Sequence, residues 1–120
     1  MTAKKFRLRA EEIKPLVQGC GGCFATDMIT VQGRKVGFMY REEPDFKGDS
    51  GWRFLAGVES HEYLDNHANL AIYDVNTIAN YDPEIMPLLA APTGSAFERH
   101  AKSGRFVETR VPDDPLEENS

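Results

Sequence analysis

Two segments in which aromatic residues alternate with other residues limit the possible folds of this chain more than any other feature. The alternating positions are Val36, Phe38 and Tyr40 in the first segment, and Trp52, Phe54 and Ala56 in the second. A strand points successive side chains to opposite faces, so this spacing is typical of strands over 36–43 and 51–57. Residues 44–50 between them are rich in Pro, Asp, Gly and Ser, which favour turns. We therefore expect an antiparallel hairpin with its aromatic side chains buried in the core.

Shorter signals surround this hairpin. Further strands are predicted over 23–31, which includes a kink, over 70–73, and at the edge over 106–107. Helices are predicted after the capping residues Asp74, Asp82 and Ser95, and a short strand with a helical turn is predicted in 4–14. The expected fold class is α+β: one small domain with a largely antiparallel or mixed β-sheet and a few short helices packed on it.

Composition excludes several functional classes. The formal net charge is −5 and the pI is about 5.2, whereas binding to nucleic acid calls for clustered Lys and Arg. Charged residues interrupt the apolar ones throughout the first 14 positions, unlike a secretory signal, and no apolar run reaches the roughly 20 residues of a membrane span. We expect a cytoplasmic protein that binds neither nucleic acid nor membrane.

The spacing of Cys20 and Cys23 is that of a CxxC motif, which can bind zinc or exchange disulfides. Zinc normally takes four ligands, and the three histidines, His61, His67 and His100, form no second ligand pair. The alternative is a glycine-permitted bend leading two small side chains into a strand. We favour the bend and predict no metal, no cofactor and no catalytic residue, since no nucleophile or phosphate-binding motif is present.

The predicted hairpin contains two arginines, Arg41 and Arg53. Within its own strand, each points to the face opposite the alternating aromatic side chains. If the register brings them together, their guanidinium groups can hold a carboxylate or a phosphate. The alternative is that they pair with the neighbouring acids as a structural network. Those acids are Glu42, Glu43, Asp45 and Asp49.

Five sequence blocks together resemble one known family. They are CFATDMITV (23–31), YREEP (40–44), DSGWRF (49–54), NTIANYDP (76–83) and GSAFER (94–99). The resemblance is to the bacterial family DUF2185, also called Imm33-like, and it implies a small α+β domain over residues 23–110. It also implies, for some relatives, a role as an immunity protein of polymorphic toxin systems. Residues 1–22 would form an N-terminal strand and turn region, and residues 111–120 a disordered acidic tail.

Three functional hypotheses follow. The first is a protein that binds and neutralises a toxin, the second is an anion or small-molecule binder built on Arg41 and Arg53, and the third is an enzyme of unknown type. The first ranks highest because occluding a toxin needs only a complementary surface, and an acidic protein suits a basic partner. The predicted binding surface is the end of the hairpin: Arg41, Glu42, Glu43, Asp45, Phe46, Asp49 and Arg53. Phe46 is either its apolar anchor or folds back under the loop.

Overall fold

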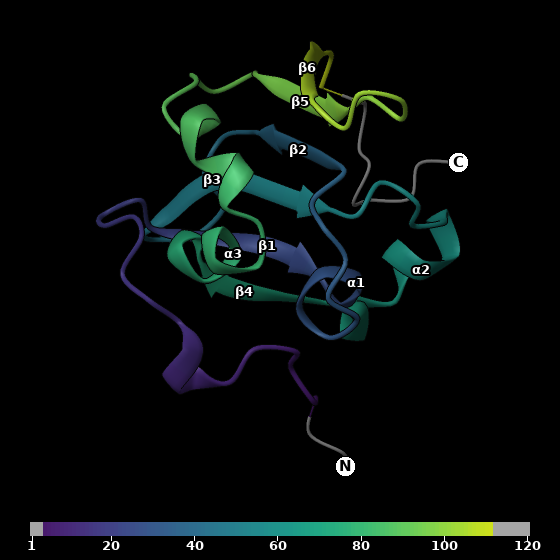
Figure 1. Ribbon diagram of the computed structural model, residues 1–120. Helices are drawn as coiled ribbons and strands as arrows, with labels where there is room; N and C mark the ends of the chain where they lie inside the picture. The colour runs from purple at the N-terminus through teal and green to yellow at the C-terminus, as the bar shows by residue number, and fades with distance from the viewer. Residues whose placement is uncertain (1–3, 112–120) are drawn as a thin grey trace.

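A computed structural model describes residues 4–111 and shows one sheet with short helices on it (Figure 1). The strands lie in the order β4-β1-β3-β2-β5-β6. Their bounds are β1 Gly22–Thr26, β2 Phe38–Arg41, β3 Asp49–Leu55, β4 Leu70–Asp74, β5 Ala96–Arg99 and β6 Phe106–Thr109. The pair β1 and β3 is parallel, and the other neighbours are antiparallel. The mixed sheet and short helices confirm the α+β prediction.

The helical segments are all short. Their bounds are α1 Asp27–Thr30, α2 His61–Asp65, α3 Val75–Tyr81, and the 3-10 helices η1 Ala10–Glu12, η2 His67–Asn69 and η3 Pro83–Leu88. The predicted caps Asp74 and Asp82 are present: the Asp74 side chain accepts from Asn76 N, and the Asp82 side chain accepts from Glu84 N. The segment after Asp82 is a 3-10 helix and not the expected α-helix. Pro87 lies inside it and lacks the N–H that an α-helix would need.

The predicted hairpin forms from β2 and β3, and its register, which the sequence left open, places the aromatic positions of the two strands on opposite faces. Met39 pairs with Phe54, and Arg41 pairs with Trp52. Each rung therefore combines an aromatic position of one strand with a non-aromatic position of the other. Alternation along one strand shows which of its side chains share a face. It does not show which side chains of the neighbouring strand lie on that same face. The expectation that Arg41 and Arg53 project together from one face is wrong.

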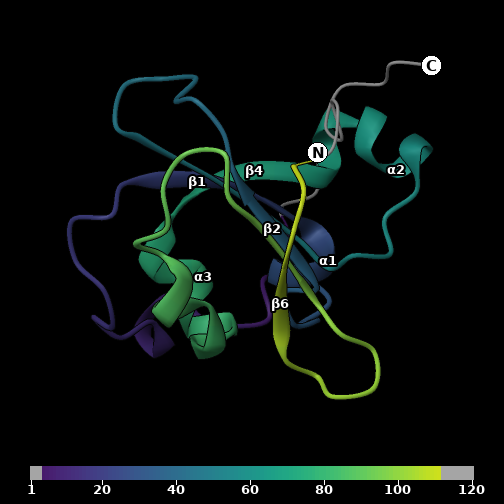
Figure 2. The same ribbon diagram turned by 90° about the horizontal axis from the view of Figure 1, so that it is seen from above.

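This register gives the sheet two faces that both carry aromatic side chains. The covered face packs Met39, Trp52 and Phe54 under α1, α3 and η3, through the buried residues Ile29, Val75, Ile78 and Ile85. The other side of the sheet, here called the open face, carries Phe24, Phe38, Tyr40, Arg53, Leu55, Ile72, Glu98 and Val107. Helix α2 reaches this face at one end through Leu64. Helices α3 and α2 thus lie on opposite sides of the strands (Figure 2).

Burial of the hairpin aromatics agrees with the prediction. Tyr40, Trp52 and Phe54 have at most 1% of their surface exposed, whereas Phe38 is only half-buried. Trp52 Nε1 also donates to the carbonyl of Leu89 at 3.2 Å, so its polar atom is satisfied inside the core.

Three other segments differ from their predictions. Residues 28–31 do not extend the first strand: residues 27–30 form α1, because a helical turn buries Ile29 and Thr30 beneath the sheet. Residues 96–99 form β5 where a helix was expected, since the polar segment after Glu98 supplies no apolar helical face. In residues 4–14 a 3-10 turn forms, but no strand. Of the predicted disordered tail, residues 112–120 lie outside the described residues.

Candidate functional site

The open face is bounded by two different structures. At one end the loop between β2 and β3 folds over the sheet, with Phe46 against Phe24 at a ring-centroid distance of 5.8 Å. At the other end lies α2, whose own Leu64 is buried against the sheet. The two edge strands of this face carry exposed apolar side chains: Ile72 on β4 is 54% exposed, and Val107 on β6 is 43% exposed. The open face therefore offers apolar surface that the covered face does not.

Arg53 is a buried charge within this face. Its Nη1 and Nη2 donate to the two carboxylate oxygens of Asp49 at 2.9 and 2.7 Å, and its Nε donates to Glu42 at 2.5 Å. The Phe24 ring lies over the guanidinium, 4.7 Å from its carbon. The side chains of Arg53 and Asp49 are completely buried, whereas that of Glu42 is 44% exposed. The carbonyl of Trp52 accepts one more bond from Nη1, so four of the five N–H donors are occupied.

The same contacts fix the charges of this pair. Burial acts to raise the pKa of Asp49 and to lower the pKa of Arg53. Burial is the largest single effect on each group, but the hydrogen bonds and opposite charges around the pair together outweigh it. The N–H groups of Asp45 and Gly51 contribute at Asp49, and the Glu42 carboxylate contributes at Arg53. The pKa of Asp49 therefore lies below its ordinary value, and the pKa of Arg53 lies above its own. Both groups stay ionised at neutral pH. The alternative interpretation of the arginines, a structural network with neighbouring acids, thus describes Arg53.

Arg41 lies on the covered face and is also occupied. Its Nε donates to the carbonyl of Ser50 at 2.9 Å and its Nη1 to the carbonyl of Ala91 at 2.7 Å. Its guanidinium carbon is 5.6 Å from the centroid of the Trp52 ring. Arg41 and Arg53 therefore do not converge on a common ligand, and this geometry does not support the anion-binding hypothesis.

The remaining residues of the predicted surface belong to the loop. Glu43 and Asp45 are exposed, whereas Phe46 is half-buried against Phe24 and Gly22. The backbone N–H of Asp45 donates to Asp49 at 2.7 Å, so the buried carboxylate also holds the loop in place. The packing of Phe46 supports the interpretation that it folds back under the loop. The exposed acids remain candidates for contact with a partner.

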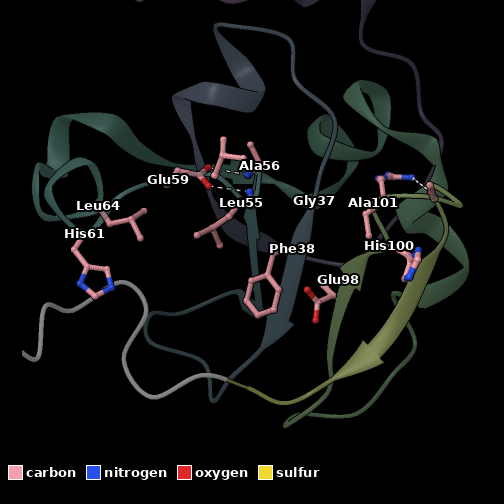
Figure 3. A pocket seen from close by; sticks show the side chains of 14 residues that line it. Gly37, Phe38, Leu55, Ala56, Glu59, His61, Leu64, Glu98, His100 and Ala101 are labelled. Atoms are coloured by element: carbon pink, nitrogen blue, oxygen red, sulfur yellow. Dashed lines mark hydrogen bonds between the residues drawn. The ribbon is translucent and has the colours of Figure 1, made fainter.

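A groove that sequence analysis missed lies at the α2 end of the open face. One residue from each of four adjacent strands forms a cross-strand row: Leu55 on β3, Phe38 on β2, Glu98 on β5 and Val107 on β6. Phe38, Leu55 and Glu98 line a groove of about 600 Å³, together with Val58 and Leu64. Figure 3 shows the Glu98 carboxylate beside the Phe38 ring. Within residues 4–111, no hydrogen bond or ion pair engages this carboxylate.

The second acid in the groove has a different role. The Glu59 carboxylate accepts from the backbone N–H groups of Ala56 and Gly57 at 2.7 and 2.9 Å, and from the Thr26 hydroxyl at 2.6 Å. These bonds shape the chain between β3 and α2, which forms one wall of the groove. Glu59 is thus held by its own chain, and Glu98 is the acid that remains available.

Sequence analysis placed Glu98 in the helix predicted after Ser95 and so overlooked it. The available signal was the alternation of Ala96 and Glu98 with Phe97, followed by a turn and a second β-rich segment at 106–109. That pattern indicates a second hairpin. The pairing of Glu98 with Phe38 depends on contacts between distant segments, which local patterns do not specify.

The cysteines occupy structural positions. Cys23 is fully buried in β1, and Cys20 packs half-buried against the same core. Both are free thiols, and burial raises the pKa of the Cys23 thiol above its ordinary value, which suppresses the reactive thiolate. In the part of the chain that the structure describes, no three His, Cys, Asp or Glu side chains are grouped to hold a metal ion. None of the helices described there could span a bilayer.

The fold and its surfaces define a small α+β domain whose sheet has one face packed under helices. On the other face the central residues Tyr40, Arg53 and Leu55 are buried, and Ile72 and Val107 are exposed on the edge strands. Comparison with known families identifies it further: the Immunity protein Imm33 domain matches residues 23–110. The chain belongs to this family, as the sequence resemblance indicated. Searches of the curated proteins and of the solved structures found no match.

Proposed function

We propose that this protein is an immunity protein that binds a toxin of a bacterial polymorphic toxin system and blocks its action in the cytoplasm. The observation that carries the proposal is the match of the Imm33 immunity domain to residues 23–110, which include the whole sheet. Binding by occlusion requires a stable complementary surface and no catalytic group.

The surface of the molecule supports binding through the open face. Helices cover one side of the sheet, so the apolar residues Ile72, Val58 and Val107 are exposed on or beside the other. Exposed apolar side chains near charged ones are common at protein interfaces, and Val58 and Val107 lie at the end of this face where Glu98 is exposed. The net charge of −5 and the exposed acids Glu43 and Asp45 favour a basic partner and speed its association.

The other two hypotheses have less support. An anion site shared by the hairpin arginines would need their guanidinium groups to converge, whereas Arg41 and Arg53 lie on opposite faces of the sheet. For the enzyme hypothesis, the family match names an immunity domain and no catalytic activity. Toxin binding is therefore the function that we put forward.

Growth protection tests this proposal. We expect a toxin gene immediately upstream of the gene for this protein. That toxin would be expressed from an inducible promoter in a sensitive strain, together with this protein or with an unrelated protein of similar size as control. We expect growth to be restored only by this protein. Growth arrest despite comparable expression of the folded protein would contradict an immunity function against that toxin.

A further inference from the structure

We propose that the groove between β2, β5 and α2 receives an arginine or lysine side chain of the toxin, carried on an apolar segment. The inference rests on the proposed function and specifies the surface and the chemistry of the partner. It starts from the cross-strand row, in which Glu98 stands between the apolar side chains of Phe38 and Val107.

An unpaired acid in this position selects for a cation. Glu98 is exposed and hydrated in the free protein. A partner that covers the groove removes that water, and burying a carboxylate without a counter-charge is costly. A neutral apolar segment would therefore be disfavoured, whereas a guanidinium or ammonium group would replace the lost water with a charge-assisted hydrogen bond.

The protein does not supply that cation from the neighbouring strand position. Arg99 follows Glu98 in β5, but its side chain lies on the covered face. There its Nη2 donates to Asp82 at 2.6 Å and its Nη1 to Glu84 at 2.6 Å. The Phe106 ring also lies 4.3 Å from its guanidinium carbon. Arg99 is thus held in place, and the charge of Glu98 remains for a partner.

The apolar lining suits the stem of a basic side chain. Phe38, Leu55 and Leu64 form the interior of the groove, and Val58, 63% exposed, stands at its margin. Lys and Arg pack their methylene groups on such surface while the charged end stays at its edge. The Phe38 ring beside Glu98 adds a favourable contact with the cation. A volume of about 600 Å³ accommodates neighbouring apolar side chains of the same segment.

Two other occupants fit less well. Residues 112–120 of this chain contain the acids Asp113, Asp114, Glu117 and Glu118 and no Lys or Arg, so they cannot supply the cation. A second copy of the chain carries the same net charge of −5, which opposes association. A basic protein partner satisfies both the apolar lining and the acid.

Amide chemical shifts of the full-length protein test the groove directly. The probes are the capped peptides acetyl-Leu-Arg-Leu-amide and acetyl-Leu-Glu-Leu-amide. We expect the arginine peptide to shift the amides of Phe38, Leu55 and Val107, and the glutamate peptide to leave them unchanged. Glu98→Gln should weaken binding of the arginine peptide by about threefold or more. Glu108→Gln, on the adjacent strand but on the covered side, is the matched control.

Three results of this titration would overturn the groove proposal: equal shifts with both peptides, shifts confined to other surfaces, or no shifts at all. Shifts of the same amides that depend on protein concentration alone would assign the groove to a second copy and would also overturn it. The proposal would also be overturned if deletion of residues 112–120 changed the chemical shifts of these amides and neither peptide did. That result would assign the groove to the chain's own tail.

Growth protection separates this inference from the proposed function. We expect Glu98→Lys to lose protection and Glu108→Lys to retain it, with equal thermal stability of the two variants as the control for folding. If the wild-type protein protects and both variants protect equally, the groove proposal is overturned and the immunity function stands. If the wild-type protein does not protect, the immunity function is overturned. The proposal that the toxin occupies the groove is then overturned as well.

Discussion

At the scale of single residues, the buried pair of Arg53 and Asp49 organises the end of the hairpin. Asp49 accepts from Arg53 and from the backbone N–H groups of Asp45 and Gly51, so one carboxylate links β3 to the preceding loop. Glu42 completes the contacts of the guanidinium from β2's end. The YREEP and DSGWRF blocks therefore contain a structural network, in which Glu42 and Asp49 are both bonded to Arg53.

Arg53→Met is expected to destabilise the protein by about 3–5 kcal/mol, because it leaves the Asp49 carboxylate buried without its counter-charge. The free energy of unfolding from urea titration measures the loss. Arg105→Met, at an exposed position, is the control and should change stability by less than about 0.5 kcal/mol. Equal stability of the two variants would show that the pair contributes nothing to folding.

At the scale of elements, the start of β3 depends on close backbone approach. Gly51 has φ of 90°, and a Cβ there would lie 2.2 Å from the Glu42 carbonyl oxygen. Gly48, in the loop, has a similar φ of 84° but open space around its Cβ position. The two glycines therefore share the conformational requirement and differ in packing.

This difference gives a matched pair of variants. Gly48→Ala is expected to cost about 1–2 kcal/mol for its positive φ alone. Gly51→Ala should cost at least about 1–3 kcal/mol more, because β2 and β3 must also separate to admit the methyl group. Urea unfolding of both proteins measures the gap. A Gly51→Ala protein as stable as Gly48→Ala would contradict the close approach of the strands.

The loop between β2 and β3 raises the question of whether Phe46 contacts a partner. Its ring packs edge-on against Phe24, so Phe46→Ala should lower the free energy of unfolding by about 1–3 kcal/mol. We expect toxin binding to be unchanged, and Lys47→Ala, at the exposed neighbouring position, to affect neither property. A Phe46→Ala protein of normal stability that dissociates faster from the toxin would instead make Phe46 the anchor of the interface.

The elements also show what sequence could and could not predict. The strand period of the hairpin and the caps at Asp74 and Asp82 are local features, and the structure confirms them. The register that places Arg41 and Arg53 on opposite faces depends on contacts along the whole of both strands. The groove around Glu98 depends on three strand pairings and could not be read from any one segment.

At the scale of the whole molecule, the helices divide the sheet into two unequal faces. The covered face buries the main core with Trp52 and Phe54, and it stabilises the fold. The open face keeps at the surface some apolar side chains and Glu98, an acid that has no partner within residues 4–111. We propose that this second face binds a basic protein partner, in keeping with the net charge of −5.

Titration of the purified toxin with this protein tests neutralisation by binding most directly. Toxin activity and the heat of binding would be followed in the same series of mixtures. The account predicts a saturable complex and loss of toxin activity in proportion to complex formed, without chemical change to either protein in mass spectra. Full toxin activity at saturating concentrations of the folded protein, or inactivation of many toxin molecules by each molecule of this protein, would contradict it.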